Sequence, residues 1–145
     1  MTREEFCRRY PFHIDDRVEW GDMDAFQHVN NVMYFKYFER VRIAFFEAVG
    51  FNAWMKEHGV GPILHSTQCR FRAPLTYPDD LLSGTNITNL QDDRLTMNYG
   101  VFSEGQQVLA CNGDGLLVCF DYRANTKTAI PGPMRERIME WVVTG

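Results

Sequence analysis

The sequence has 145 residues, of which 45% are hydrophobic and 23% are charged, and its formal net charge is −4. This length fits a single domain, residues 1–145, with a hydrophobic core of its own. No long run of Lys and Arg occurs, so nucleic acid is not expected as a partner, because a phosphate backbone is bound by a basic surface.

The sequence predicts neither a signal peptide nor a membrane span. The first ten residues contain three arginines but no apolar stretch, and no apolar run is long enough to cross a bilayer. We therefore expect a cytoplasmic protein with free thiols. The four cysteines lack the C-x-x-C spacing of zinc and redox sites, so no metal site is predicted. They are Cys7, Cys69, Cys111 and Cys119.

Residues 12–20 are predicted to form the first strand, because Phe12, Ile14, Val18 and Trp20 lie at even positions on one face. Residues 21–31 are polar or small and break this alternation. We therefore expect a loop between the first strand and the segment that follows.

Residues 32–49 carry the clearest helical pattern in the chain. The apolar side chains recur at spacings of three and four residues, which places them on one face of a helix; they are Tyr34, Phe38, Val41, Phe45 and Ala48. Asn30 or Asn31 can cap the start of this helix, and Gly50 can end it. Such a broad apolar face must pack on a sheet or on a partner subunit. Residues 52–58 are predicted to form a short second helix.

The second half of the chain is typical of strands. Apolar and polar residues alternate over 61–72 and 95–101, and 81–90 is a weaker strand containing Gly84. Residues 108–120 are apolar except for Asn112-Gly113-Asp114-Gly115, which is either a hairpin turn or a bend in one long strand. We favour one long strand, bent or bulged at the glycines, because hairpin arms would be very short. Residues 135–142 are a candidate final helix.

This order of elements indicates an α+β protein. Helix and strands are segregated along the chain, unlike the alternation of a doubly wound sheet. The most economical packing is a long central helix wrapped by a curved antiparallel sheet of about five strands.

The loop before the long helix contains the residues with the most evident chemistry. Residues 19–32 read EWGDMDAFQHVNNV, with two acids, a histidine and two asparagines just before the helix start. A helix N-terminus presents unpaired N–H groups that can stabilise an oxyanion, and a nearby carboxylate can attack an acyl carbon or activate water. Asp and Asn at such positions are also common caps and turn formers. Asp22, which follows Gly21 in a turn-like sequence, is the better candidate for a structural role, and Asp24 for a chemical one.

The motif Gly21-Asp22-Met23-Asp24, followed by His28-Val29-Asn30-Asn31 and an aromatic helix, resembles the 4-hydroxybenzoyl-CoA thioesterase family. The resemblance continues through residues 72–81 and into the last long strand. It implies a hotdog fold and hydrolysis of an acyl-CoA thioester at a subunit interface. It also implies that the catalytic carboxylate is Asp24, that the oxyanion donor is the backbone N–H at or near Asn31, and that His28 belongs to the same site. Whether Asp24 acts as nucleophile or as general base stays open.

The resemblance also implies the partners of the chain. Coenzyme A is part of the acyl-CoA substrate, so no separate cofactor is expected, and the assembly is expected to be a homodimer or homotetramer. Four cations are candidates to bind the coenzyme A phosphates, although most surface Arg and Lys residues only solvate the protein. They are Arg70 and Arg72, on one strand face, and Arg123 and Lys127, after the last strand.

Two other functions are compatible with this fold. A hotdog dehydratase would act on hydroxyacyl thioesters, but no histidine and acid pairing of that kind is found around His58 or His65. A non-catalytic acyl-CoA binding module would not need a carboxylate at position 24.

Overall fold

The computed structural model of the protein describes residues 1–143. Its main sheet is antiparallel, with the strand order β1-β3-β4-β5-β2, and the short β6 pairs with the end of β5. Helices and strands follow one another along the chain as α1 (Arg3–Arg9), β1 (Phe12–Arg17), the 3-10 turn η1 (Trp20–Asp22), α2 (Asn31–Ala48), α3 (Phe51–His58), β2 (Val60–Phe71), β3 (Asp80–Thr88), β4 (Arg94–Ser103), β5 (Val108–Asp121), β6 (Thr126–Lys127) and α4 (Gly132–Met139).

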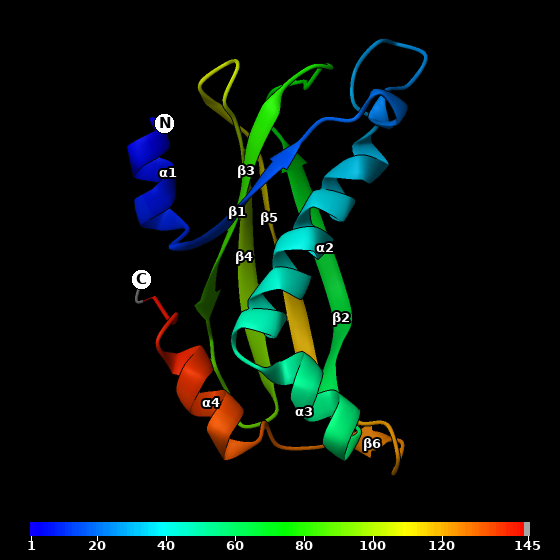
Figure 1. Ribbon diagram of the computed structural model, residues 1–145, viewed down its shortest axis with the longest axis vertical. Helices are drawn as coiled ribbons and strands as arrows, with labels where there is room; N and C mark the ends of the chain where they lie inside the picture. The colour runs from blue at the N-terminus through cyan, green and yellow to red at the C-terminus, as the bar shows by residue number, and fades with distance from the viewer. Residues whose placement is uncertain (144–145) are drawn as a thin grey trace.

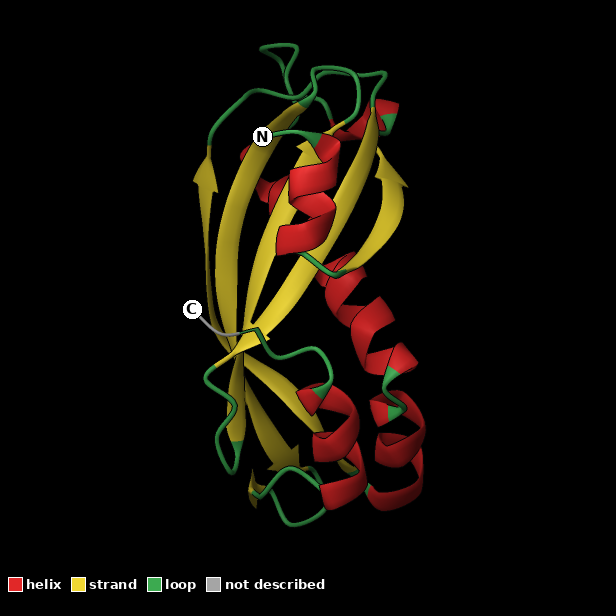
Figure 2. Ribbon diagram, turned by 90° about the vertical axis from the view of Figure 1, so that its left-hand side faces the viewer, coloured by secondary structure: helices red, strands yellow, loops and turns green. Residues whose placement is uncertain are grey.

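Helix α2 lies along one face of the sheet, and the strands curve around it (Figures 1 and 2). Its buried side chains are Tyr34, Tyr37, Phe38, Val41, Phe45 and Phe46. Burying one such side chain contributes about 1.5–3 kcal/mol, so this face is the main source of stability for the helix. A long helix held in a curved antiparallel sheet confirms the predicted α+β hotdog arrangement. Ala48, expected on the buried face, is exposed at the end of the helix.

The opposite face of the sheet, which we call the outer face, carries helix α1. Phe6 and Tyr10 form a second small core there with Leu82 and Phe102. Gly84 lies under the helix: a Cβ at this position would come within 2.6 Å of Tyr10 Cβ, so a glycine is needed for the close approach. Helix α1 was not predicted from the sequence, although Thr2 and Glu5 form the capping box that marks its start.

Strand β5 confirms the prediction of one long strand in place of a hairpin. The predicted bulge at the glycines is wrong, because Gly113 and Gly115 pair in regular register with both neighbouring strands. The extra residues lie elsewhere: Ala110 of β5, opposite Val101 and Phe102, and His65 of β2. Gly113 instead lets the Phe38 ring of α2 and the backbone of Gln68 approach the strand.

Other predicted boundaries differ from the structure at the ends of elements. The first strand ends at Arg17, and Trp20 lies in η1 and not in the strand. The final helix begins at Gly132, three residues earlier than expected, because Pro131 takes the N-cap position and Pro133 fits the first turn. It ends at Met139. Strand β2 shows no burial alternation over residues 63–68, which are all exposed, because β2 forms an edge of the sheet.

Candidate functional site

The loop between β1 and α2 is held to the rest of the molecule by backbone hydrogen bonds. Val18 N donates to Asp79 O at 2.9 Å, and Val29 N donates to Leu75 O at 2.8 Å. Across the loop itself, Asn30 N donates to Asp22 O at 2.9 Å. The loop is therefore fixed at both of its ends, so its side chains have defined positions relative to α2.

Asp22 is a structural residue of this loop. It is 5% exposed, and its Oδ2 accepts hydrogen bonds from the Tyr37 hydroxyl and from Glu19 N, both at 2.9 Å. Burial, together with the bond to Asp22, raises the pKa of Tyr37 well above its usual value. With one oxygen occupied by two protein donors in a closed environment, Asp22 is unsuited to meet a substrate.

Asp24 is half-buried at the edge of the loop. Its Oδ1 accepts a hydrogen bond from Phe26 N at 2.8 Å, and its backbone N donates to His28 O at 2.8 Å. Gln27, at a φ of 63°, closes the turn by donating from its N to Asp24 O at 3.1 Å. This tight turn keeps Asp24 and His28 close together. Within residues 1–143, the second carboxylate oxygen of Asp24 accepts no hydrogen bond.

The N-terminus of α2 faces the same region. Asn30 is the N-cap, and its Oδ1 accepts a hydrogen bond from Val32 N at 3.1 Å. The N–H of Asn31, the first helical residue, donates to no other residue in the described part of the chain. It belongs to the first turn, where the N–H groups lack intrahelical partners and the helix dipole adds partial positive charge. Asn31 N–H is thus able to bind an oxygen atom that carries negative charge.

A hollow of about 340 Å³ joins these groups, which we call the reaction hollow. Its lining side chains include Asp24, His28, Asn31, Tyr34, Phe71 and Arg72. The three residues predicted to be catalytic therefore line one space, together with one of the four predicted phosphate ligands. Burial raises the pKa of Tyr34 to about 12, so this phenol stays protonated at neutral pH.

A second hollow, of about 680 Å³, lies on another side of Asp24, and we call it the aromatic hollow. Trp20, Met23, Gln27 and Tyr77 contribute to its lining, and Asp24 lines both hollows. Trp20 is 73% exposed and meets the Tyr77 ring edge-on, with 5.6 Å between the ring centroids. This hollow was not predicted from the sequence, because Trp20 was assigned to the first strand and Tyr77 lies 57 positions further along the chain.

The other three predicted phosphate ligands lie away from the reaction hollow. Arg70 lines a third hollow, on the outer face of the sheet. Arg123 Nη2 donates to Glu57 O at 2.9 Å, beside α3, and Lys127 lies in β6. Figure 1 shows α3 and β6 at the opposite end of the molecule from the loop that carries Asp24. Within one chain, Arg123 and Lys127 are therefore not brought to Asp24.

Comparisons with known proteins agree with this architecture. A family model described as the thioesterase-like superfamily matches residues 18–142. The chain is 32% identical over 103 residues to a protein of Aquifex aeolicus named "Putative esterase", covering 70% of this chain and 80% of that protein. It is 22% identical over 126 residues to the long-chain acyl-CoA thioesterase FadM of Escherichia coli, covering 87% and 96% respectively.

A solved structure gives the same fold. The 1,4-dihydroxy-2-naphthoyl-CoA thioesterase of Synechocystis superimposes with a TM-score of 0.79 at 18% identity, covering 89% of this chain and 96% of that one. Separately, no helix among residues 1–143 is long and apolar enough to cross a membrane.

Proposed function

Because the chain belongs to the thioesterase-like superfamily, we propose that it hydrolyses acyl-CoA thioesters to a free acid and coenzyme A. The Escherichia coli and Synechocystis relatives are both named for coenzyme A thioesters as substrates. The observation that carries the proposal is that Asp24 and Asn31 line one hollow, and that the Asn31 N–H has no partner within residues 1–143. In such a hydrolase the carboxylate must reach the carbonyl carbon, or a water molecule beside it, while the oxyanion donor reaches the carbonyl oxygen.

The thioester carbonyl is proposed to bind with its oxygen toward the start of α2. Attack on the carbonyl carbon transfers negative charge to that oxygen, and the Asn31 N–H can donate a hydrogen bond to it. A donor fixed in place before the reaction stabilises the tetrahedral intermediate without reorganisation, and such a donor typically contributes about 10²–10³ in rate.

Asp24 can act in this scheme either as a nucleophile or as a general base. As a nucleophile, its carboxylate adds to the carbonyl carbon, the C–S bond breaks, coenzyme A leaves as thiolate, and water then hydrolyses the mixed anhydride. As a general base, it removes a proton from a water molecule that adds to the carbon directly, after which the C–S bond breaks, coenzyme A leaves as thiolate and the acid is released. Only the first route forms a covalent acyl group on Asp24. A single turnover in H₂¹⁸O can place label in the carboxylate of Asp24 by the first route alone.

The neighbouring side chains give the proposed substrate an orientation. His28 lines the reaction hollow and can hydrogen-bond to the thioester or to the pantetheine chain. The aromatic hollow begins at Asp24 and is lined by Trp20, Met23 and Tyr77, so it suits an apolar acyl group. We assign the acyl group to this aromatic hollow and the pantetheine end of coenzyme A, next to the thioester, to the reaction hollow.

We further propose that the protein acts as a homodimer or homotetramer. Strand β2 is the last strand of the sheet. Among residues 1–143, the backbone N–H and C=O groups along its free edge therefore face no neighbouring strand. Its side chains over residues 63–68 are exposed, including Ile63 and Leu64. A long exposed edge of this kind is suited to pairing with β2 of a second copy.

The test is a thiol-release assay with a panel of short, long and aromatic acyl-CoA substrates. Asp24→Asn keeps the size of the side chain but loses basicity and nucleophilicity, so we expect turnover to fall at least about 10²-fold with an unchanged circular dichroism spectrum. Asp15→Asn, on the exposed side of β1, is the matched control and should retain full activity. Near-normal thiol release by Asp24→Asn would refute the assignment.

The same assay distinguishes the two alternative functions. Formation of an unsaturated thioester from a hydroxyacyl-CoA, without release of thiol, would indicate a dehydratase. Stoichiometric binding of acyl-CoA without any product would indicate a binding module.

A further inference from the structure

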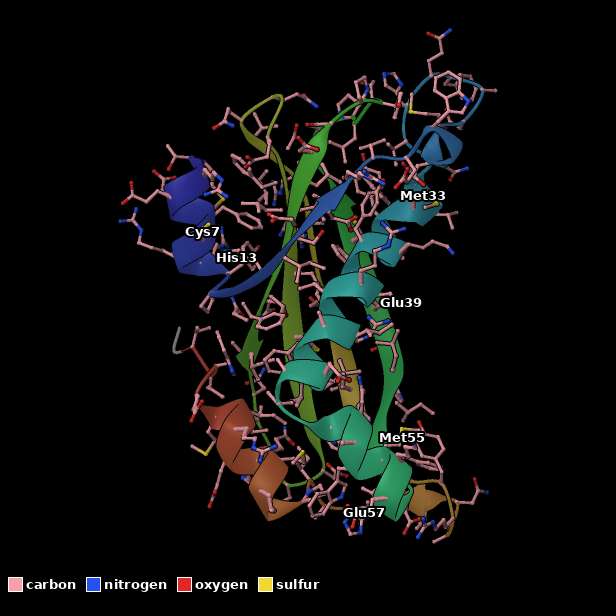
Figure 3. The ribbon with its side chains drawn as sticks, viewed as in Figure 1. Cys7, His13, Met33, Glu39, Met55 and Glu57 are labelled. Atoms are coloured by element: carbon pink, nitrogen blue, oxygen red, sulfur yellow. The ribbon has the colours of Figure 1, made fainter. Side chains whose placement is uncertain are left out.

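The outer face of the sheet contains a polar hollow of about 510 Å³ between α1 and strands β2 to β5. We call it the arginine hollow, because Arg8 and Arg9 of α1 and Arg70 of β2 line it. Helix α1, where Cys7 is labelled in Figure 3, lies beside the strands and apart from α2. The hollow is therefore separate from the space that contains Asp24, and the proposed hydrolysis does not use its residues.

The positive charge in the arginine hollow is only partly balanced by the described residues. Across 1–143, the guanidinium groups of Arg9 and Arg70 form no ion pair and no hydrogen bond, and Arg8 has only an exposed contact of 3.8 Å with Glu4. Asp114 is the one carboxylate in the lining, and its Oδ2 already accepts a hydrogen bond from Gln68 Nε2 at 2.8 Å.

Each of the nine arginines elsewhere in the described residues has a partner for its guanidinium group, and five of them donate to neutral oxygens. The other four form ion pairs with carboxylates at 2.8–3.0 Å: Arg3 with Glu104, Arg17 with Glu19, Arg40 with Asp16, and Arg94 with Asp93. The chain carries a net charge of −4, so acidic side chains are in excess. The three arginines share the hollow with a single carboxylate, so its lining keeps a net positive charge that an anionic ligand would balance.

The floor of the hollow is a network of amides that fixes its shape. Asn98 Nδ2 donates to Asn86 Oδ1 at 2.8 Å and to Thr88 Oγ1 at 3.0 Å. Asn86 Nδ2 in turn donates to Arg9 O at 2.9 Å, which ties the end of α1 to the sheet. A rigid polar floor with forked guanidinium donors above it matches a phosphate group, whose oxygens accept paired hydrogen bonds.

The arginine hollow adjoins the reaction hollow at the end of β2. Arg72, which lines the reaction hollow, donates from Nε to Asn112 Oδ1, and Asn112 lines the arginine hollow. A ligand with its reactive group at Asp24 can therefore extend past this pair of residues to the three arginines.

We propose that the arginine hollow binds the phosphate groups of the coenzyme A part of the substrate, an inference that rests on the proposed function. It assigns this role to Arg8, Arg9 and Arg70, because Arg123 and Lys127 lie at the opposite end of the same chain from Asp24. Both groups of cations are exposed, so their replacement by alanine is compatible with folding, and thermal unfolding will check this for each variant.

The test compares the double variant Arg9→Ala/Arg70→Ala with the matched control Arg123→Ala/Lys127→Ala. Each is assayed with the acyl-CoA that the wild type hydrolyses best and with the same acyl group on pantetheine, which has no nucleotide phosphates. We expect the arginine variant to raise KM for acyl-CoA by about 10- to 100-fold, with kcat and the hydrolysis of acyl-pantetheine within twofold of wild type. The control should match wild type with both substrates.

Three results would overturn the assignment: an equal loss on both substrates, no loss on acyl-CoA, or a loss in the control variant instead. Calorimetric titration with coenzyme A itself separates this inference from the proposed function. If the wild type releases no thiol from any substrate but binds coenzyme A more tightly than the arginine variant, the hydrolase proposal fails and the phosphate site stands. If the wild type hydrolyses acyl-CoA but the wild type and the arginine variant bind coenzyme A equally, the phosphate site fails and the hydrolase proposal stands.

Discussion

The Tyr37 hydroxyl donates a hydrogen bond of 2.9 Å to Asp22 Oδ2 in the buried space between α2 and the loop that precedes it. Asp22 also accepts from Glu19 N, and its carbonyl oxygen accepts from Asn30 N at 2.9 Å, just before the first turn of α2. One buried tyrosine thus connects the helix to the loop that carries Asp24.

Replacement of Tyr37 by phenylalanine removes this connection and leaves the packing of the ring intact. Loss of a buried hydrogen bond to a charged group should lower the free energy of unfolding by about 1.5–3 kcal/mol, as measured by urea denaturation. Tyr34→Phe is the matched control, because its hydroxyl makes only a 3.4 Å contact with Ala73 O. Equal stability of the two variants would contradict the structural role given to Asp22.

Trp20→Ala should change which acyl groups the protein hydrolyses. If the acyl chain lies in the aromatic hollow, each buried methylene stabilises the transition state by about 0.8 kcal/mol, so kcat/KM rises about fourfold per methylene. Removal of the indole should flatten this dependence and leave acetyl-CoA hydrolysis within twofold of wild type. Phe26→Ala, which removes an aromatic ring that is 83% exposed in the same loop, is the control. A uniform loss across all chain lengths would argue against the acyl assignment.

Gly113→Ala should destabilise the fold. A Cβ at position 113 would overlap the carbonyl oxygen of Gln68 on the neighbouring strand and come within 2.9 Å of the Phe38 ring. Overpacking of this kind costs about 1–3 kcal/mol in the free energy of unfolding. Gly132→Ala is the control, because nothing lies within 4 Å of its added Cβ. The prediction is wrong if chemical denaturation gives both variants the stability of wild type.

The protein should lose stability at alkaline pH through Tyr34. Burial raises the pKa of this phenol in the folded state to about 12, above its value of about 10 in an unfolded chain. Below pH 10 both states hold the proton, so stability is unaffected; between pH 10 and 12 only the folded state keeps it, and stability falls as pH rises. Urea unfolding at pH 9 and pH 11 should show a smaller fall for Tyr34→Phe than for wild type. Tyr77→Phe, at an exposed position, should behave like wild type.

The sequence alone predicted the elements whose signals are local. The apolar spacing over residues 32–49 marked α2 to within one residue, and the run over 108–120 marked β5 as a single strand. The structural role of Asp22 was also predicted from the sequence, since Gly21-Asp22 has the composition of a turn. These features depend on side chains a few residues apart, whose relative positions follow from backbone geometry.

The prediction of the reaction site was also local, because Asp24, His28 and Asn31 span only eight residues around one helix start. The roles of Asp24, His28 and Asn31 remain predictions, for which their shared hollow gives the geometric basis. The aromatic hollow was not predicted, because Trp20 and Tyr77 are 57 positions apart and meet only when the loop packs against the segment before β3.

Only the tertiary structure decided which cations share a space. Arg70 and Arg123 are indistinguishable in sequence, since each is a basic residue in or after a strand. Folding places Arg70 with Arg8 and Arg9 on the outer face of the sheet, and Arg123 beside α3 at the other end. Coulomb forces depend on distance in space and not on separation along the chain. The spacing of apolar residues in the sequence therefore determined the long helix, the strands and the loop between them. The arginine hollow, in contrast, arose only when the sheet folded and α1 packed on its outer face.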